Sequence, residues 1–262
     1  MKNILETLAE LTAERVAAEK SYRPLNSVRA DAEALPKGDF PFENALKTDD
    51  IAFICECKKA SPSKGLIAPD FPYLHIAKEY EKAGADCISV LTEPRYFLGS
   101  DRYLQEIART VAIPCLRKDF TVDPYMIYQA KLLGASAVLL ICAILEPERL
   151  REYHEIAQSL GLSALVEAHD EHEIETAAAI GARIIGVNNR NLKDFSVDVR
   201  RAQNLRKYAP ADTLFVVESG MQTAADIQAA RDAGADAVLV GETLMRAPDK
   251  AEKLRELKGI SA

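Results

Sequence analysis

Eight short apolar runs, rich in β-branched residues, recur along the chain and are separated by amphipathic segments with helical periodicity. This alternation is typical of parallel βαβ units, in which each strand is followed by a helix that returns to the start of the sheet. The runs begin at intervals of about 20 to 36 residues, close to the roughly 30 residues of one such unit. They lie at residues 51–57, 87–91, 113–116, 137–141, 164–166, 184–187, 214–217 and 237–240.

A second repeat is superimposed on the first, because a Gly-Ala dipeptide precedes every other run. Its glycines lie about 50 residues apart, at Gly84, Gly134, Gly181 and Gly234. We expect each of them to end a helix in the left-handed conformation just before a strand. A closed eight-stranded barrel explains both repeats, whereas an open doubly wound sheet explains only the alternation and would carry a Gly-x-Gly-x-x-Gly after its first strand. The predicted fold is therefore α/β, a single (β/α)8 TIM barrel.

The first 50 residues stand outside this pattern. We expect residues 1–50 to form a helical extension packed on a barrel of residues 51–262, as one domain overall. Asn3 can cap a first helix whose third residue is Glu6. The apolar face expected for that helix consists of Ile4, Leu8 and Leu11. The stretch 22–50, with its three prolines, predicts an irregular connection with one further helical turn.

Charge and hydropathy limit the possible partners. A formal net charge of −7 offers no broad basic surface to nucleic acid or to an anionic membrane, so an anionic ligand has to be captured locally. No apolar run reaches the roughly 20 residues that span a bilayer. The start of the chain predicts an amphipathic helix rather than a signal peptide. We therefore expect a cytoplasmic protein that acts on a small molecule. We expect the protein itself to be a monomer or a weak homo-oligomer.

Cysteine and histidine patterns give no metal prediction. The five cysteines lie in or beside the apolar runs and are expected to be reduced core residues. Cys55 and Cys57 have the spacing of half a metal site, but no second pair of ligands accompanies them. His169 and His172 lie beyond the end of a predicted strand, and we expect both to be solvated. No metal and no organic cofactor is predicted.

Charged residues gather at the predicted carboxyl ends of strands, where barrel enzymes carry their catalytic groups. Because side chains alternate along a strand, Glu56 and Lys58 share one face, which we expect to point into the barrel mouth. Lys118 and Glu167 end two further strands of the same odd-numbered set. Such ammonium and carboxylate groups, close together, can transfer protons without a metal. A lysine in this setting can also form a Schiff base with a carbonyl substrate, so an aldolase-type reaction stays open.

The last two strands end in small residues that let backbone amides approach an anion. These are Ser219 and Gly220 after the seventh run and Gly241 after the eighth, the loops that bind phosphate in many barrels. Ser61, in the loop after the first run, can add a hydroxyl donor. That loop, residues 60–65, is rich in turn-forming residues and is a candidate lid.

The chain closely resembles the indole-3-glycerol-phosphate synthases. The resemblance rests on motifs that follow one another over about 190 residues and are not shared by phosphoribosylanthranilate isomerase. They are ECKKASPSKG (56–65), SVLTEPRYFLGS (89–100), LRKDFTVD (116–123), ALVEAHDE (164–171), IIGVNNRNL (184–192), VVESGM (216–221) and VLVGETLMR (238–246).

The resemblance implies a substrate and a set of catalytic roles. The substrate would be 1-(2-carboxyphenylamino)-1-deoxyribulose 5-phosphate, and the products indole-3-glycerol phosphate, carbon dioxide and water, in tryptophan biosynthesis. Lys118 would be the acid at the ketone oxygen, Glu167 a base or proton shuttle, and Lys58 a second acid. Glu56 would hold the lysines by ion pairing, and Asn188 would orient groups near Glu167.

It also implies the substrate-binding residues. Arg190 or Lys58 would meet the substrate carboxylate, and Phe97 and Leu239 would line the anthranilate ring. The phosphate would be bound by Ser61, Ser219, Gly220 and Gly241. Glu242 departs from family members with serine at this position, and we expect its carboxylate to point away while its backbone amide contributes. Two rival interpretations are another phosphate-barrel enzyme, an isomerase or Schiff-base aldolase, and an inactive barrel kept as a binding scaffold.

Overall fold

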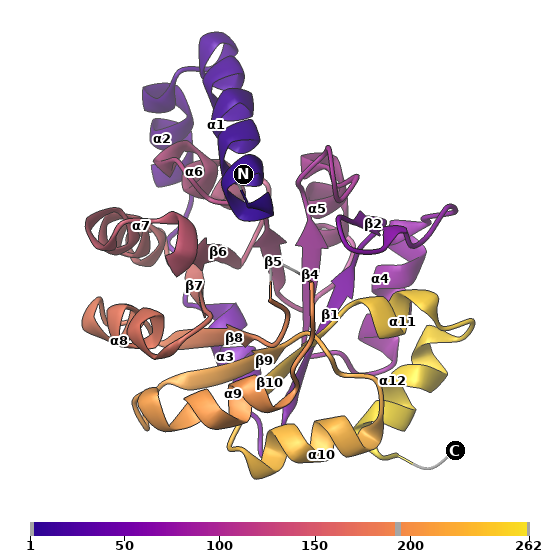
Figure 1. Cartoon of the computed structure of the whole chain (residues 1–262). Helices are drawn as coiled ribbons and strands as arrows, with labels where there is room; N and C mark the ends of the chain where they lie inside the picture. Colours follow the sequence, from indigo (N-terminus) through magenta and orange to yellow (C-terminus); the bar gives the residue numbers. More distant parts are fainter. Residues whose placement is uncertain (1–2, 192–194, 261–262) are drawn as a thin grey trace.

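Eight parallel strands close into a barrel in the computed structural model, which describes residues 3–191 and 195–260 (Figure 1). Neighbouring strands follow the order β1-β10-β9-β8-β7-β6-β5-β4, so each pairs with its neighbour in sequence and β1 pairs with β10. The strands are β1 (Ala52–Cys57), β4 (Cys87–Leu91), β5 (Cys115–Lys118), β6 (Ala137–Ile141), β7 (Ser163–Ala168), β8 (Ile184–Asn188), β9 (Leu214–Glu218) and β10 (Ala237–Val240). The predicted barrel is confirmed.

Helices surround the barrel as an outer layer, one or more after each strand. The α-helices are α4 (Tyr73–Lys82), α5 (Asp101–Ala108), α6 (Pro124–Leu132), α7 (Pro147–Ser159), α8 (Glu171–Ala179), α9 (Arg200–Leu205), α10 (Ala224–Asp232), α11 (Glu242–Arg246) and α12 (Lys250–Lys258). The 3-10 turns η1 (Cys142–Ile144) and η2 (Arg206–Tyr208) accompany them. None of the helices within residues 3–191 and 195–260 is long and apolar enough to cross a membrane.

The repeats seen in the sequence have the expected local structure. Gly84, Gly134, Gly181 and Gly234 have φ angles of +88°, +86°, +77° and +76°, the left-handed region that favours glycine at the end of a helix. The third strand begins two residues later than predicted. It follows Pro114, which has no N–H for a strand ladder.

Strand alternation divides the core into two layers. Ala52 and Ile54 of β1 point inward and pack with residues of the other strands inside the barrel. Phe53, Cys55 and Cys57 point outward and pack under the helices. This is the arrangement predicted for the two cysteines, and it places Glu56 on the inward face.

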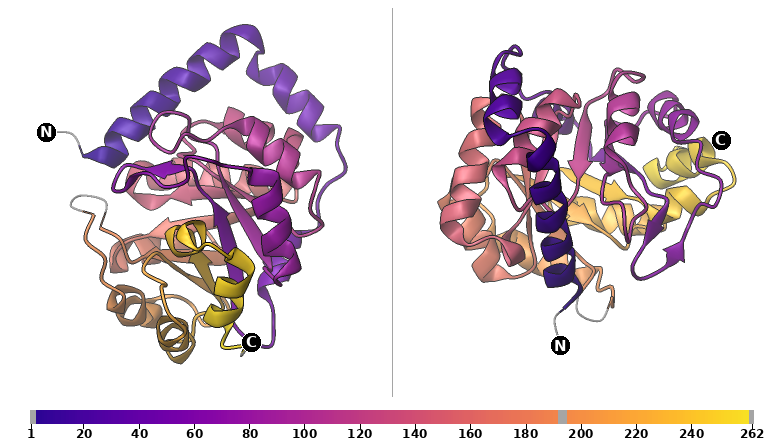
Figure 2. Two further views of the ribbon diagram at one scale, coloured as in Figure 1. Left: turned by 90° about the vertical axis from the view of Figure 1, so that its right-hand side faces the viewer. Right: turned by 90° about the horizontal axis from the view of Figure 1, so that it is seen from above.

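The extension before the barrel contains three helices, α1 (Ile4–Tyr22), α2 (Leu25–Glu33) and α3 (Pro41–Leu46). The prediction of a single helical turn after α1 was therefore wrong. A proline precedes α2, and another opens α3 at its first turn, where a missing N–H costs nothing. Seen from above in Figure 2, α1 crosses the barrel at its mouth.

The capping box predicted for α1 is present, with Asn3 and Glu6 bonded to each other's backbone amides. Its buried face was only partly predicted. Leu8 is buried as expected, whereas Ile4 and Leu11 are half-buried. The buried residues of α1 are Leu5, Leu8, Thr12 and Val16. The contact surface is therefore turned by about one residue around the helix, because α1 packs on strand ends and loops rather than on a flat sheet.

At the opposite end, α3 packs against the base of the barrel. Phe42 and Leu46 are fully buried and belong to the same apolar cluster as the inward-facing residues of the strands. Glu43 receives hydrogen bonds from Lys47 and from Arg183, the residue before β8. Residues 3–50 thus reach both ends of the barrel.

Candidate active site

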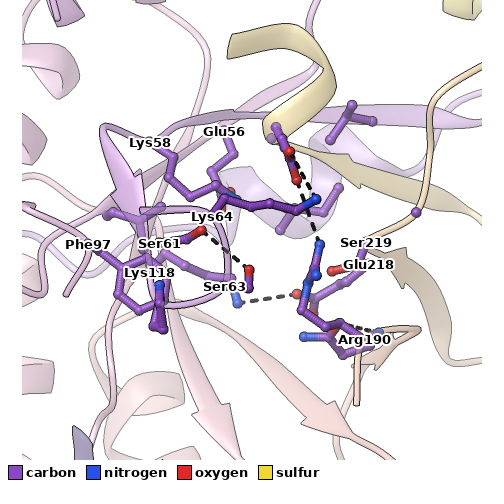
Figure 3. Close-up of a pocket in the computed structure, with 18 of the residues that line it drawn as sticks. Glu56, Lys58, Ser61, Ser63, Lys64, Phe97, Lys118, Arg190, Glu218 and Ser219 are labelled. Carbon is purple, nitrogen blue, oxygen red and sulfur yellow. Dashed lines mark hydrogen bonds and ion pairs between the residues drawn. The ribbon is translucent and has the colours of Figure 1, made fainter. Parts of the chain in front are cut away.

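A cavity of about 730 Å³ opens at the carboxyl ends of the strands (Figure 3), and Ile4, Leu5 and Leu8 of α1 also line it. All thirteen residues predicted from the sequence line it, although they come from seven of the eight barrel strands and the segments that follow them. They are Glu56, Lys58, Ser61, Phe97, Lys118, Glu167, Asn188, Arg190, Ser219, Gly220, Leu239, Gly241 and Glu242.

Lys118 lies at the centre of this cavity between two buried carboxylates. Its Nζ is 3.2 Å from Glu167 Oε2 and 3.2 Å from Glu218 Oε2. The three residues lie at or next to the ends of β5, β7 and β9, alternate strands whose inward side chains meet at one level. Burial alone would lower the pKa of Lys118, but Glu218, Glu167 and Glu56 outweigh it and raise that pKa above its ordinary value. Lys118 is therefore held as an ammonium group, and burial does not make it a weakly basic amine.

The two carboxylates beside Lys118 have different protonation. Burial works to raise the pKa of Glu167, but Lys118 and His169 hold it well below its usual range. For Glu218, burial and the neighbouring Glu167 raise the pKa to about 7 despite the attraction of Lys118. Near neutral pH the site therefore offers one carboxylate as a base and one carboxyl group that still holds part of its proton.

Glu218 is the site residue that the sequence analysis missed. It ends β9, and membership of the odd-numbered strands together with Glu56, Lys118 and Glu167 was the signal that would have found it. The backbone makes room for it at Gly186 on β8, where a Cβ would lie 2.4 Å from Glu218 Oε1. This oxygen is buried and has no hydrogen-bond partner among the described residues.

A second ion pair lies on the wall formed by β1. Lys58 Nζ donates to Glu56 Oε2 at 2.5 Å, and both side chains are largely buried. The end of β10 leaves space for them, because a Cβ on Gly241 would lie 2.3 Å from Glu56 Oε2 and 2.8 Å from Lys58 Nζ. Gly241 thus has a steric role in addition to the exposed backbone amide predicted for it.

The opposite end of the cavity is lined by small residues and by cations. Ser219 and Gly220 follow β9 with φ angles of +67° and +86°, so the chain turns sharply there. Ser61 lies across the cavity in a short hairpin, β2 (Ala60–Ser61) and β3 (Gly65–Leu66), and its hydroxyl faces that of Ser63 at 3.5 Å.

Glu242 does not behave as expected. Its carboxylate lines the cavity and lies 3.6 Å from Lys64 Nζ, 3.9 Å from Arg190 Nη2 and 3.0 Å from Arg246 Nε. The prediction that it points away was wrong, because three cations surround it. Three positive charges outweigh the one negative charge of the carboxylate, so this end of the cavity can still receive an anion.

The remaining predicted residues complete the walls. Leu239 and Phe97 form an apolar side, and the ring of Phe97 is 6.0 Å from that of Phe120. Asn188 Oδ1 accepts a hydrogen bond from the backbone amide of Arg190 at 3.0 Å. Asn188 thus contacts the loop after β8, and its expected role of orienting groups near Glu167 stays a prediction.

The two histidines after β7 have different environments. His172 is exposed as expected, but His169 is partly buried, and its ring lies between Glu167 and Glu173. The prediction of a solvated His169 was wrong because the chain turns between β7 and α8 and brings the ring between these two carboxylates. No cluster of histidine, cysteine and carboxylate side chains suited to a metal ion occurs in the described part of the chain.

Comparisons with known proteins give the family. The family model for indole-3-glycerol phosphate synthase matches residues 5–257. The chain is 56% identical to the indole-3-glycerol phosphate synthase of Ruminiclostridium cellulolyticum, with 98% of this chain and 99% of that protein covered. It is 53% identical to the one of Endomicrobium trichonymphae, over 97% and 99% of the two chains.

Solved structures show the fold alone. The 3-hexulose-6-phosphate synthase of Salmonella typhimurium superposes with a TM-score of 0.66 at 14% identity, over 80% of this chain and 98% of that chain. It has the same type of barrel, but so low an identity carries no activity across. The family model and the relatives, in contrast, match over nearly the whole length. The chain therefore belongs to the indole-3-glycerol phosphate synthase family.

Proposed function

We propose that this enzyme closes, decarboxylates and dehydrates 1-(2-carboxyphenylamino)-1-deoxyribulose 5-phosphate with the ion-paired cluster around Lys118. The observation that carries the proposal is the ammonium of Lys118, held between Glu167 and Glu218 on the floor of one cavity. Because its pKa is raised, this amine is a proton donor and a poor nucleophile. That argues against the rival Schiff-base aldolase, which needs a neutral lysine.

The reaction needs acids and a base in a fixed order. The ring carbon that bears the carboxylate attacks the ketone, whose oxygen takes a proton from Lys118. Carbon dioxide then leaves and returns its bonding electrons to the ring, which becomes aromatic again. The new hydroxyl leaves as water with a second proton, from Lys58 as the second acid, while Glu167 removes a proton from the neighbouring sugar carbon. Two protons are thus donated and one is removed, so each turnover of a substrate with an ionised carboxylate consumes one proton from solvent.

The remaining roles follow the shape of the cavity. Glu56 holds Lys58 in place, and Phe97 and Leu239 support the anthranilate ring. Arg190 or Lys58 binds the substrate carboxylate. Asn188 shapes the loop that carries Arg190.

The phosphate group belongs at the cationic end of the cavity. There the backbone amides of Ser219, Gly220 and Gly241 and the hydroxyl of Ser61 are the proposed donors. The amide of Glu242 contributes in the same way, while its carboxylate is neutralised by the surrounding cations.

The enzyme is further proposed to work in the cytoplasm as a monomer or weak homo-oligomer, without a cofactor. Residues 1–50 and the barrel of residues 51–262 would act as one domain. The mixed and net acidic charge supports a small anionic ligand as the partner, and not nucleic acid or a membrane surface.

Replacement of the central acid tests the proposal. Lys118→Ala is expected to reduce turnover by at least about 10³-fold in an indole-fluorescence assay while substrate still binds. Lys82→Ala, an exposed lysine on α4, is the matched control and should retain wild-type turnover. Near-normal rates in Lys118→Ala would refute the assignment of this lysine as the acid.

A further inference from the structure

We infer that His169 is a positioning residue for the reaction, which fixes and ionises Glu167 without touching the substrate. The inference rests on the proposed role of Glu167 as the base. His169 does not line the cavity, so its influence has to pass through the carboxylate beside it.

The geometry places the imidazole between two carboxylates. His169 Nε2 lies 3.2 Å from Glu167 Oε1, and its Nδ1 lies 3.0 Å from Glu173 Oε2. Glu173 Oε2 also accepts a hydrogen bond from the backbone amide of His169 at 2.7 Å. Glu173 therefore fixes both the backbone and the ring of His169. With a carboxylate oxygen close to each nitrogen, the ring is stable as an imidazolium cation.

The two oxygens of Glu167 are thus held by different cations. Lys118 Nζ donates to Oε2 from inside the cavity, while His169 faces Oε1 from the side of α8. The Nε2 atom makes no well-aligned hydrogen bond, so its contact with Oε1 is an ion pair rather than a directional bond. This leaves Oε2 as the atom that faces the reacting groups, and the imidazolium stabilises the ionised form of the base.

Charge in the surroundings agrees with this assignment. Burial alone would lower the pKa of His169, but Glu167 and Glu173 raise it to about 10. The other titratable groups facing this pair are Lys118, Glu218 and Cys142. Burial raises the pKa of the Cys142 thiol, which therefore stays neutral. Glu218 is either neutral or negatively charged, so it supplies no positive charge to Glu167. His169 and Lys118 are thus the two cations beside Glu167, one at each carboxylate oxygen.

A path to solvent runs through the same three residues. The side chain of Glu167 is 2% exposed, that of His169 16% and that of Glu173 19%. The order from buried base to surface thus gives Glu167 a route by which it can release the proton that it takes from the sugar carbon in each turnover. Replacing His169 removes both the positive charge and this connection.

The test compares pH profiles of His169→Gln with those of His172→Gln, in which the exposed histidine of α8 is replaced. In His169→Gln the pKa of Glu167 rises, so the acid limb of kcat/KM should move to higher pH by about one unit or more. kcat should fall about tenfold while KM changes little. The His172→Gln profile should superimpose on that of wild type.

Two outcomes would overturn the inference: a His169→Gln profile that coincides with the control, or a raised KM with unchanged kcat. If His169→Gln does not fold, Glu173→Gln decides. It lowers the pKa of His169, so its alkaline limb should move to lower pH, and an unmoved limb refutes the inference. Glu167→Gln, measured in parallel, separates the two claims, because full activity in that variant refutes the proposed base itself.

Discussion

Gly241 follows the last residue of β10 and lies against the ion pair of Glu56 and Lys58. The space for a methyl group there is already occupied by those side chains, the nearest atom being 2.3 Å away. Gly241→Ala should therefore displace both side chains and lower kcat by about 10²-fold, since small displacements of catalytic groups are costly. Steady-state kinetics measures the effect.

A second glycine gives the matched control. Gly181 has a φ of +77° and open space around its Cβ position. Gly181→Ala should lose about 1 kcal/mol of stability through backbone strain, with kcat unchanged. Equal kinetic losses in the two variants would contradict the steric account of Gly241.

The raised pKa of Glu218 makes stability depend on pH. In the folded enzyme its carboxyl titrates at about 7 instead of 4.5, so between these values the folded state binds a proton that the unfolded chain has released. The free energy of unfolding therefore falls as the pH rises through this window. Relative to Glu218→Gln, the wild type should lose on the order of 2 kcal/mol between about pH 5 and pH 8.

Urea unfolding at several pH values measures this difference. Glu171→Gln, an exposed carboxyl at the start of α8, should instead run parallel to wild type. A constant offset between wild type and Glu218→Gln would show that Glu218 titrates in the normal range.

Individual residues were predicted unevenly from the sequence. Lys118 and Glu167 could be found because a charge that ends an apolar strand is conspicuous. His169 was missed because its contacts depend on where the chain turns after β7, and sequence spacing does not specify that. Glu242 was misjudged because the cations that surround it, Lys64 and Arg190 among them, come from loops far away in the sequence.

Among the elements, α1 is joined to the loop that follows Lys118. Arg15 Nη2 donates to Asp119 Oδ2 at 2.8 Å, and Asp119 is fully buried. Arg15→Met would leave this carboxylate with fewer partners and should destabilise the fold by about 2 kcal/mol. Because Asp119 adjoins the central lysine, kcat should fall about tenfold as well. Thermal unfolding and kinetics on one preparation measure both effects.

Arg29→Met is the control for this variant. Arg29 pairs with Glu33 on the exposed face of α2, and such surface pairs contribute little. Both stability and turnover should stay at wild-type levels. If Arg15→Met also kept wild-type stability and turnover, the ion pair between α1 and the active-site loop would contribute to neither.

The strands were easier to predict than the extension. A run such as β6 or β10 is buried on both faces and therefore reads as continuous apolar sequence, which periodicity detects directly. In the extension, α2 and α3 are short and take much of their stability from packing on the barrel. Their propensity alone predicts a loop, and only the tertiary contacts of residues such as Phe42 decide otherwise.

At the scale of the whole molecule, the cysteines report on its integrity. Four of the five are buried and Cys142 is half-buried, all as free thiols. Burial raises the pKa of Cys115 to about 12, so the reactive thiolate is scarce. Ellman's reagent should modify the four buried thiols at least about 10²-fold more slowly in native enzyme than in guanidinium chloride. Rapid modification without loss of activity would show that the barrel opens locally.

The pairing of β1 with β10 has a consequence for synthesis on the ribosome. Ala52 meets Ala237 across the barrel seam, so one edge of β1 waits for its partner until almost the entire polypeptide has been translated. Until then the nascent chain exposes an unpaired strand edge, together with α1 and α3, whose docking surfaces are still incomplete. Vectorial synthesis therefore leaves the earliest segment of this enzyme among the last to reach its native contacts.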